Sequence, residues 1–202
     1  MKKEKLNNSL YHNDRKNNIV VAASIIFAEK GYERTTLQDI ATEIGITKAT
    51  LYYYYNSKHQ ILFEIVIKSI SNAISHMSQI AESPIATKEK INLAFQQHFK
   101  FYLTNHPGPS VMLHEKTNFL PLELEVIVKS KYREYISLWE KILREGVESG
   151  IIRSDLDVKM MRWAAIGMCN WAYKWAHSEG KLQFNQIATI FSKVFTEGVI
   201  KH

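Results

Sequence analysis

The sequence predicts an all-α protein with an N-terminal three-helix module and a larger helical C-terminal domain. Apolar residues recur at spacings of three and four along most of the chain, which is the period of an amphipathic helix. Glycine or proline marks the end of several of these stretches. With 46% apolar and 11% aromatic residues, a chain of 202 residues can bury a substantial core.

The chain begins with a polar segment that has no apolar period. Residues 1–14 include three lysines and three asparagines and are expected to form a flexible basic arm. A contact with DNA and the absence of any role are both open for this arm. From Arg15 to Lys30 the apolar positions follow helical spacing, and Gly31 comes next. A first helix is therefore expected to end at this glycine.

Residues 36–58 predict two short helices joined by a three-residue turn. Thr35 and Gln38 have the spacing of a capping box at the start of the first helix. Gly45 supplies the positive φ that ends a helix and turns the chain. Thr47 is expected to cap the second helix. This pattern is typical of a helix-turn-helix, in which the second helix enters the major groove of DNA.

Four consecutive tyrosines occupy residues 52–55 of the second helix. Successive residues advance about 100° around a helix, so the four phenols cannot all lie in the core. Leu51 and Tyr52 are expected to pack inward, which leaves some of the other tyrosines exposed beside lysines. Exposed phenols beside cations suit contacts with phosphates and bases. Residues 15–56 are therefore predicted to form a helix-turn-helix DNA-binding domain.

Residues 57–202 are predicted to form a helical effector-binding and dimerisation domain. A second capping box, made by Ser57 and Gln60, begins it. Its helices are expected over residues 57–81, 87–105, 110–118, 121–150, 155–177 and 184–199. The last two are apolar on more than one face, so they are expected to pack against their copies in a second chain. The resulting homodimer would carry two DNA-reading heads for a palindromic operator.

Several classes of protein are excluded by what the sequence lacks. It contains no H-E-x-x-H, G-x-S-x-G or Walker motif, and its eight histidines have no metal-ligand spacing. We therefore expect no enzymatic activity, cofactor or metal. The single cysteine, Cys169, excludes an intrachain disulfide.

Location and charge also follow from the composition. The first residues lack the apolar region of a signal peptide, and no stretch has the length of a membrane span, so a cytoplasmic protein is expected. The net charge is +6, and residues 1–60 hold nine Lys and Arg against six Asp and Glu. This density favours a phosphate-binding N-terminal end.

Several short motifs together resemble the DNA-binding domain of the TetR family of bacterial transcriptional regulators. They are the runs 27–32, 35–36, 40–41, 45–55 and 57–58. Tyr55 stands where the family usually has phenylalanine, and Ala49 where glycine or proline is common. The resemblance implies that Lys48, Ala49, Thr50 and Tyr54 face base edges. It also implies that Thr36, Tyr53 and Lys58 contact phosphates. The predicted DNA-binding residues are Thr36, Thr47, Lys48, Ala49, Thr50, Tyr53, Tyr54 and Lys58.

The C-terminal half, from Trp139 to Trp175, is similar to TetR-type regulators of fatty-acid and sterol breakdown, which implies an acyl-CoA effector. The candidate ligand-binding residues are Phe95, His98, Phe101, Met112, Trp139, Met168, Asn170, Trp171, Lys174 and Trp175. The alternative for this set is an ordinary core with a satisfied histidine. The expected function is a repressor released from its operator by a small hydrophobic effector. A ligand-independent architectural DNA-binding protein is the alternative.

Overall fold

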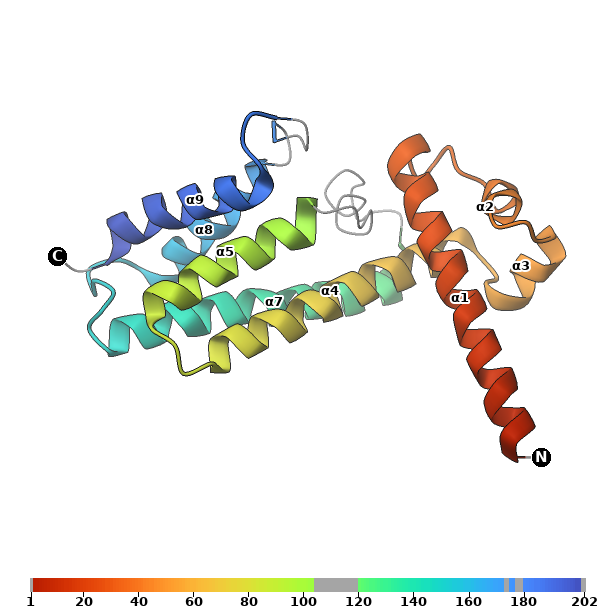
Figure 1. Ribbon diagram of the computed structural model, residues 1–202, viewed down its shortest axis with the longest axis horizontal. Coiled ribbons are helices and arrows are strands. Elements are labelled where there is room, and N and C mark those ends of the chain that lie inside the picture. The colour runs from red at the N-terminus through yellow and green to blue at the C-terminus, as the bar shows by residue number, and fades with distance from the viewer. Residues whose placement is uncertain (1, 104–119, 173–174, 177–179, 201–202) are drawn as a thin grey trace. The chain divides into compact units, whose positions relative to one another are not determined.

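The computed structural model describes residues 2–103, 120–172, 175–176 and 180–200, with side chains of the first helix from Asp14 onward. Its helices are α1 (Lys2–Lys30), α2 (Leu37–Glu43), α3 (Lys48–Tyr54), α4 (Lys58–Glu82), α5 (Thr87–Leu103), α7 (Leu122–Glu148), α8 (Val158–Ala172) and α9 (Phe184–Val199) (Figure 1). An isolated antiparallel bridge joins Ile152 to Ile200. The predicted all-α class is confirmed. The short helix expected over residues 110–118 lies outside the described residues.

The chain forms two compact units. The N-terminal unit comprises Met1–Ser69 with His106–Val128, and the C-terminal unit comprises Ile70–Asn105 with Lys129–His202. The division falls within α4, whereas the sequence placed the domain boundary at residue 57. The reason is that α4 is continuous, so its first turns pack with the N-terminal helices and its later turns with the C-terminal ones.

Helix α1 is longer than the sequence indicated, because it begins at Lys2 and has 29 residues. Residues 2–14, which we expected to be a flexible arm, continue the helix. This segment contains neither glycine nor proline. Once residues 15–30 form a helix, each further residue adds a hydrogen bond without a new nucleation cost. The missing apolar period therefore did not indicate the absence of a helix.

The cap of α2 also differs from the expected one by a single residue. Thr36 is the N-cap, and its hydroxyl accepts a hydrogen bond from the Asp39 amide at 3.1 Å. The Asp39 carboxylate accepts in return from the Thr36 amide at 2.7 Å. Thr35 instead donates its hydroxyl to the Gly31 carbonyl at 2.8 Å. The carboxylate of Asp39 is a stronger acceptor than the Gln38 amide, which favours this register.

The short helices α2 and α3 each pack one apolar side into the core of the N-terminal unit, and this packing holds α3 in place. Ile40 of α2 and Leu51 of α3 are fully buried. They belong to a core that also includes Ile19, Ala23 and Phe27 of α1 and Ile61 and Ile65 of α4. Burying a Leu or Ile side chain contributes about 1.5–3 kcal/mol. Such contacts fix the orientation of a helix that is only seven residues long.

The C-terminal unit has α5 at its centre. Helix α5 packs on α9 and α8 (Figure 1), and its residues Ile91, Ala94 and Phe95 are fully buried. The Phe95 ring meets the Trp139 ring of α7 edge to face, with 5.4 Å between centroids. Trp139 is the largest of the fully buried side chains. The sides of α8 and α9 that face away from this aromatic centre are exposed in the single chain.

None of the helices described here combines the length and the apolar character needed to cross a membrane.

Candidate nucleic-acid interface

The turn between α2 and α3 adopts the geometry that the sequence predicted. Gly45 has φ +65°, and no neighbouring atom would obstruct a Cβ there. Glycine is therefore favoured by the backbone angle itself. The Ile46 amide donates to the Ala41 carbonyl at 2.9 Å, which folds the turn back onto α2. Thr47 then caps α3 by accepting a hydrogen bond from the Thr50 amide at 3.1 Å, as expected.

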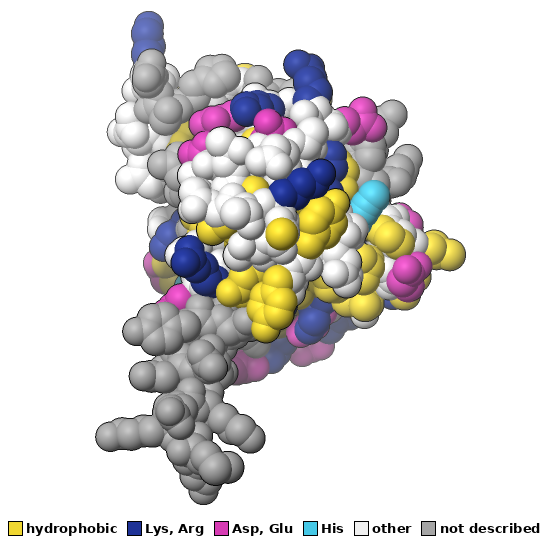
Figure 2. Space-filling model, turned by 90° about the vertical axis from the view of Figure 1, so that its right-hand side faces the viewer, with side chains coloured by type: hydrophobic (Ala, Val, Ile, Leu, Met, Phe, Trp, Pro, Cys, Tyr) yellow, Lys and Arg dark blue, Asp and Glu magenta, His cyan; other side chains and the backbone are white. Residues whose placement is uncertain are grey.

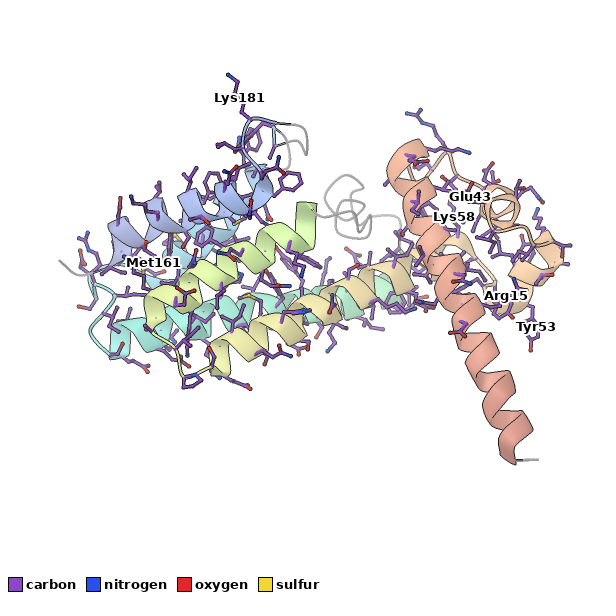
Figure 3. The ribbon with its side chains drawn as sticks, viewed as in Figure 1. Arg15, Glu43, Tyr53, Lys58, Met161 and Lys181 are labelled. Atoms are coloured by element: carbon purple, nitrogen blue, oxygen red, sulfur yellow. The ribbon has the colours of Figure 1, made fainter. Side chains whose placement is uncertain are left out.

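The tyrosine run is distributed differently from the prediction. Leu51 is fully buried, as expected, but Tyr52 is 44% exposed and does not pack inward. Tyr53 is 76% exposed and projects away from the unit (Figure 3). Tyr55 is buried instead, at 3% exposure. It lies beyond the last residue of α3 in an extended conformation, with φ −142° and ψ 119°. Leaving the helical path turns its side chain inward.

The exposed side of α3 presents polar and cationic groups at its N-terminal end. Thr47, Lys48, Ala49 and Thr50 are all exposed. The Lys48 ammonium lies 5.8 Å from the centre of the Tyr52 ring, within the range of a cation–π interaction. Figure 2 views the N-terminal unit from this side, where hydrophobic side chains, tyrosine included, lie among lysine and arginine side chains. A surface of this kind suits a phosphate-lined groove.

Tyr52 is a residue of this surface that sequence reasoning missed. The helical period assigned it to the core together with Leu51, although both cannot occupy one narrow buried stripe. The position at which α3 ends could have revealed that Tyr52 is exposed. Asn56-Ser57 breaks the helix, so Tyr55 leaves the helical path and takes the inward position.

Two other predicted DNA contacts have partners within the protein. The Thr36 hydroxyl is exposed but bonds the Asp39 carboxylate at 2.6 Å. The Lys58 ammonium donates to the carbonyls of Tyr32, Glu33 and Thr35 at 2.6, 3.2 and 2.8 Å. These carbonyls belong to the turn between α1 and α2. In this structure Lys58 therefore fastens α4 to that turn, and the phosphate contact that the resemblance implied stays a prediction.

The predicted ligand-binding residues that the structure describes have different surroundings in the C-terminal unit. Phe95, His98 and Trp139 are fully buried, and the Trp139 ring contacts the rings of both Phe95 and His98. Phe101 and Met168 are partly buried against the same core. Trp171 and Trp175 are 66% and 45% exposed. Met112 and Lys174 lie outside the described residues.

His98 belongs to a hydrogen-bonded chain that joins α5, α7 and α8. One ring nitrogen lies 2.8 Å from the Tyr135 hydroxyl, and the other lies 3.0 Å from the Asn170 side-chain oxygen. The Trp139 indole donates to the same Tyr135 hydroxyl at 3.3 Å. Because the Asn170 oxygen can only accept, Nε2 of His98 carries the proton and Nδ1 accepts from Tyr135. The polar groups of His98 and Tyr135, both buried, thus have hydrogen-bond partners within the protein.

Burial also determines the charge of this chain of groups. It lowers the pKa of the His98 imidazole to about 4, although the hydrogen bond to Asn170 acts in the opposite direction. Burial raises the pKa of the Tyr135 phenol and of the Cys169 thiol. All three groups are neutral near pH 7, so this part of the unit is an uncharged core.

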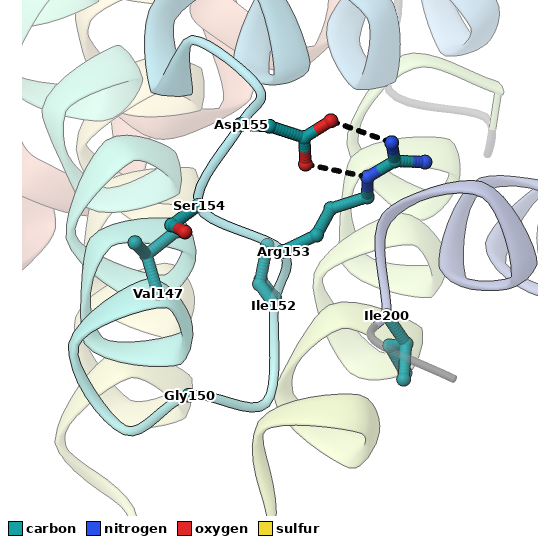
Figure 4. A pocket seen from close by; sticks show the side chains of 7 residues that line it. All are labelled: Val147, Gly150, Ile152, Arg153, Ser154, Asp155 and Ile200. Atoms are coloured by element: carbon teal, nitrogen blue, oxygen red, sulfur yellow. Dashed lines mark hydrogen bonds and ion pairs between the residues drawn. The ribbon is translucent and has the colours of Figure 1, made fainter.

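Among the residues that the structure describes, two hollows of ligand size lie elsewhere in the C-terminal unit. One, of about 380 Å³, lies beside the loop after α7 (Figure 4), and is lined by Val147, Gly150, Ile152, Arg153, Ser154, Asp155 and Ile200. Its Arg153 guanidinium is already paired with Asp155 by hydrogen bonds of 2.7 and 2.6 Å. The other is a groove of about 410 Å³ between α4, α5 and α9, lined by Ile80, Leu93, Gln96, Gln97, Phe99, Lys100, Phe184 and Asn185. None of the predicted ligand-binding residues lines either hollow.

No cluster of three or more metal-ligating side chains occurs within the described ranges of the chain.

Comparison with known families decides what kind of helix-turn-helix protein this is. Residues 19–65 match the model of bacterial regulatory proteins of the tetR family. Residues 85–199, more than half of the chain, match the tetracyclin repressor-like C-terminal domain. The chain belongs to the TetR family. It therefore has the two-part architecture of the family, a helix-turn-helix domain followed by a C-terminal helical domain.

Individual TetR-family relatives align with most of this chain. The HTH-type transcriptional repressor KstR2 of Mycolicibacterium smegmatis is 26% identical over 92% of this chain and 90% of its own. The fatty acid metabolism regulator protein of Bacillus subtilis is 28% identical over 74% of this chain and 76% of its own. The crystal structure of the regulator PfmR from Thermus thermophilus superposes with a TM-score of 0.82, at 28% identity, over 89% of this chain and 97% of that one. This TetR-family chain is thus similar to transcriptional regulators over nearly its whole length.

Proposed function

We propose that this protein is a homodimeric transcriptional repressor that binds a palindromic operator through α2 and α3. The observation that carries the proposal is the exposed side of α3, where Lys48, Thr50 and Tyr53 face solvent while Leu51 anchors the helix in the core. A helix held by one buried stripe can place its other side in a major groove. The repressor relatives support the same reading.

The two-fold arrangement is supported by apolar side chains that one chain leaves uncovered. Met160, Trp163 and Trp171 of α8 are 61%, 49% and 66% exposed, and Ile190 and Val194 of α9 are 45% and 58% exposed. They follow helical spacing on each helix. Large exposed apolar surfaces of this kind mark protein interfaces. A second copy of the chain would bury them in a four-helix interface and pair the two reading heads.

Binding to DNA can be tested without knowing the operator. The purified protein would select duplexes from a randomised library, and footprinting would define the protected bases. We expect a short palindrome whose half-sites lie about one helical turn, roughly 34 Å, apart. Uniform protection without a preferred sequence would favour the architectural alternative.

We further propose that a small hydrophobic effector, an acyl-CoA, releases the repressor from DNA. The resemblance of the C-terminal half and the fatty acid metabolism regulator among the relatives support this class of ligand. The groove between α4, α5 and α9 fits a short acyl chain, because Ile80, Leu93 and Phe184 give it apolar walls. Its volume of about 410 Å³ is within the range of ligand sites, and Lys100 at the groove suits an anionic head.

The effector and its place can be tested together. Native mass spectrometry of freshly purified protein would reveal a co-purified acyl-CoA, and titration with acyl-CoAs of increasing chain length should lower the affinity for the selected duplex. Leu93→Trp would fill the groove and abolish that response. If Leu93→Trp responds as the wild type does, the effector binds elsewhere, and the predicted set around Phe95 and Trp139 becomes the next candidate.

A further inference from the structure

The Glu64 carboxylate on α4 contacts the C-terminal end of α3, the helix proposed to read the DNA and called the reading helix below. Tyr55, the C-cap of α3, is 3% exposed. Its hydroxyl donates to the Glu64 carboxylate at 2.6 Å. A buried phenol needs a hydrogen-bond partner. Phenylalanine, which lacks the hydroxyl, would need no such partner. The presence of tyrosine at this position therefore makes the position of Glu64 matter to α3.

The same carboxylate is linked to α1. Glu64 forms an ion pair with Lys68 at 2.8 Å, and the Lys68 ammonium lies 3.4 Å from the Asn17 side-chain oxygen on α1. The Lys16 ammonium, also on α1, lies 5.2 Å from the centre of the Tyr55 ring. One carboxylate thus connects three elements of the N-terminal unit.

The electrostatics keep this arrangement in one protonation state. Burial acts to raise the pKa of Glu64, but hydrogen bonds from Lys68 and Tyr55 and the charges of Lys68 and Lys16 outweigh it, so the pKa lies below its ordinary value. Burial and the bond to Glu64 raise the pKa of Tyr55. Near neutral pH the phenol is therefore a donor and the carboxylate an acceptor, which makes the bond charge-assisted and short.

A short helix depends on its ends for its orientation. Helix α3 has seven residues, too few to be stable alone. Its N-terminal end is capped by Thr47, and Leu51 anchors its middle. The bond from Tyr55 to Glu64 fixes its C-terminal end. A shift of α4 at Glu64 would consequently move that end, and with it the exposed side chains of Tyr52 and Tyr53.

We propose that Glu64 is a positioning residue for DNA recognition, which sets the orientation of α3 through the Tyr55 hydroxyl and links it to α1 through Lys68. The inference rests on the proposed function, because it assigns Glu64 a role in operator binding without a contact to DNA. It adds to that function a defined point at which α4 controls the reading helix.

The experiment measures affinities by fluorescence anisotropy, on the duplex that the wild type selects from a randomised library and on a scrambled duplex of the same composition. The fraction of each preparation that can bind DNA is first measured by titration, so that a loss of folded protein is not mistaken for a loss of affinity. The variants are Glu64→Ala, Glu64→Gln, Tyr55→Phe and the double variant Tyr55→Phe/Glu64→Ala. Glu134→Ala is the control, because Glu134 forms an exposed ion pair with Lys131 at 2.8 Å on α7.

We expect Glu64→Ala to bind the selected duplex about tenfold more weakly, with a smaller effect on the scrambled duplex, and the control to bind as the wild type does. Glu64→Gln should bind within about threefold of the wild type, since its amide oxygen still accepts from Tyr55. The double variant should bind the selected duplex no more weakly than Glu64→Ala does, because both changes remove the same hydrogen bond between Tyr55 and Glu64.

Three results would overturn the inference: wild-type affinity of Glu64→Ala, equal losses on both duplexes, or independent losses that multiply in the double variant. If Glu64→Ala does not fold, Tyr55→Phe and Glu64→Gln decide, and wild-type affinity of Tyr55→Phe would count against the inference. Failure of the wild type to select any duplex would instead reject the proposed function.

Discussion

Lys48 is the single residue that brings a positive charge to the start of the reading helix. Its ammonium lies over the Tyr52 ring, which restricts the side chain before DNA binds. We expect Lys48→Ala to weaken binding to the selected duplex and to relax base preference. The cost is about 1–3 kcal/mol if the ammonium contacts a base edge. Comparison of affinities for the selected duplex and its single-base variants measures both effects.

An exposed lysine far from α3 in sequence provides the control for this change. Lys131→Ala removes a charge of the same kind from α7, where the lysine pairs with Glu134. It should leave base preference unchanged. If Lys48→Ala kept the wild-type preference, the assignment of this residue to base reading would be wrong.

Lys58 distinguishes a contact within the protein from a contact with DNA. Its ammonium is held by three carbonyls of the turn after α1, so we expect Lys58→Met to lower the free energy of unfolding by about 1–3 kcal/mol. The dependence of operator affinity on salt should keep its slope. Urea unfolding and affinities over a series of salt concentrations measure the two quantities. A slope flattened by about one unit would instead indicate a phosphate contact.

At the scale of elements, His98 joins α5 to α7 and α8 in the C-terminal unit. Burial lowers the pKa of its imidazole to about 4 in the folded state, below the ordinary value near 6.5. Between these values the unfolded chain binds a proton that the folded chain does not. The contribution of neutral His98 to the free energy of unfolding is therefore complete above about pH 6.5. It is lost as the pH falls towards 4, by about 3 kcal/mol in all.

This pH dependence can be measured against a variant that does not titrate at position 98. The free energy of unfolding of the wild type should fall more steeply from pH 7 to pH 4.5 than that of His98→Gln. Carboxylates contribute equally to both proteins, so the difference between the two curves isolates the histidine. Parallel curves would show that the imidazole is not kept neutral by burial.

At the scale of the whole molecule, the uncovered apolar sides of α8 and α9 predict self-association. Val194 is 58% exposed on α9, so Val194→Lys should cost a single chain little stability but place a charge in the proposed interface. We expect mass photometry to show monomers in place of dimers. Operator affinity should fall more than tenfold, since one head reads too few base pairs.

The matched variant is Leu122→Lys, which changes an apolar residue that is more exposed than Val194, at 72%, at the start of α7. It should remain dimeric and bind the selected duplex as the wild type does. A dimer of unchanged stability in Val194→Lys would place the interface on another surface.

Much of the N-terminal unit could be predicted from local sequence alone. The glycine turn at Gly45, the Thr47 cap and the buried Leu51 follow from backbone angles, hydrogen-bonding capacity and helical period, which act over a few residues. The same holds for the all-α class and for the helix that ends at Gly31, whose φ is +83°. The sequence therefore determined where α3 begins and that Leu51 anchors it.

Tertiary structure decided which side chains remain available to bind. The inward turn of Tyr55, its bond to Glu64 and the capture of Lys58 by three carbonyls all depend on groups that lie far apart in the sequence, between 9 and 26 residues away. The same is true of His98, whose partner Asn170 is 72 residues away. Helical period shows only which side of a helix is apolar. The partner of a buried polar group is set by how the helices pack, because it must be satisfied wherever the fold places it.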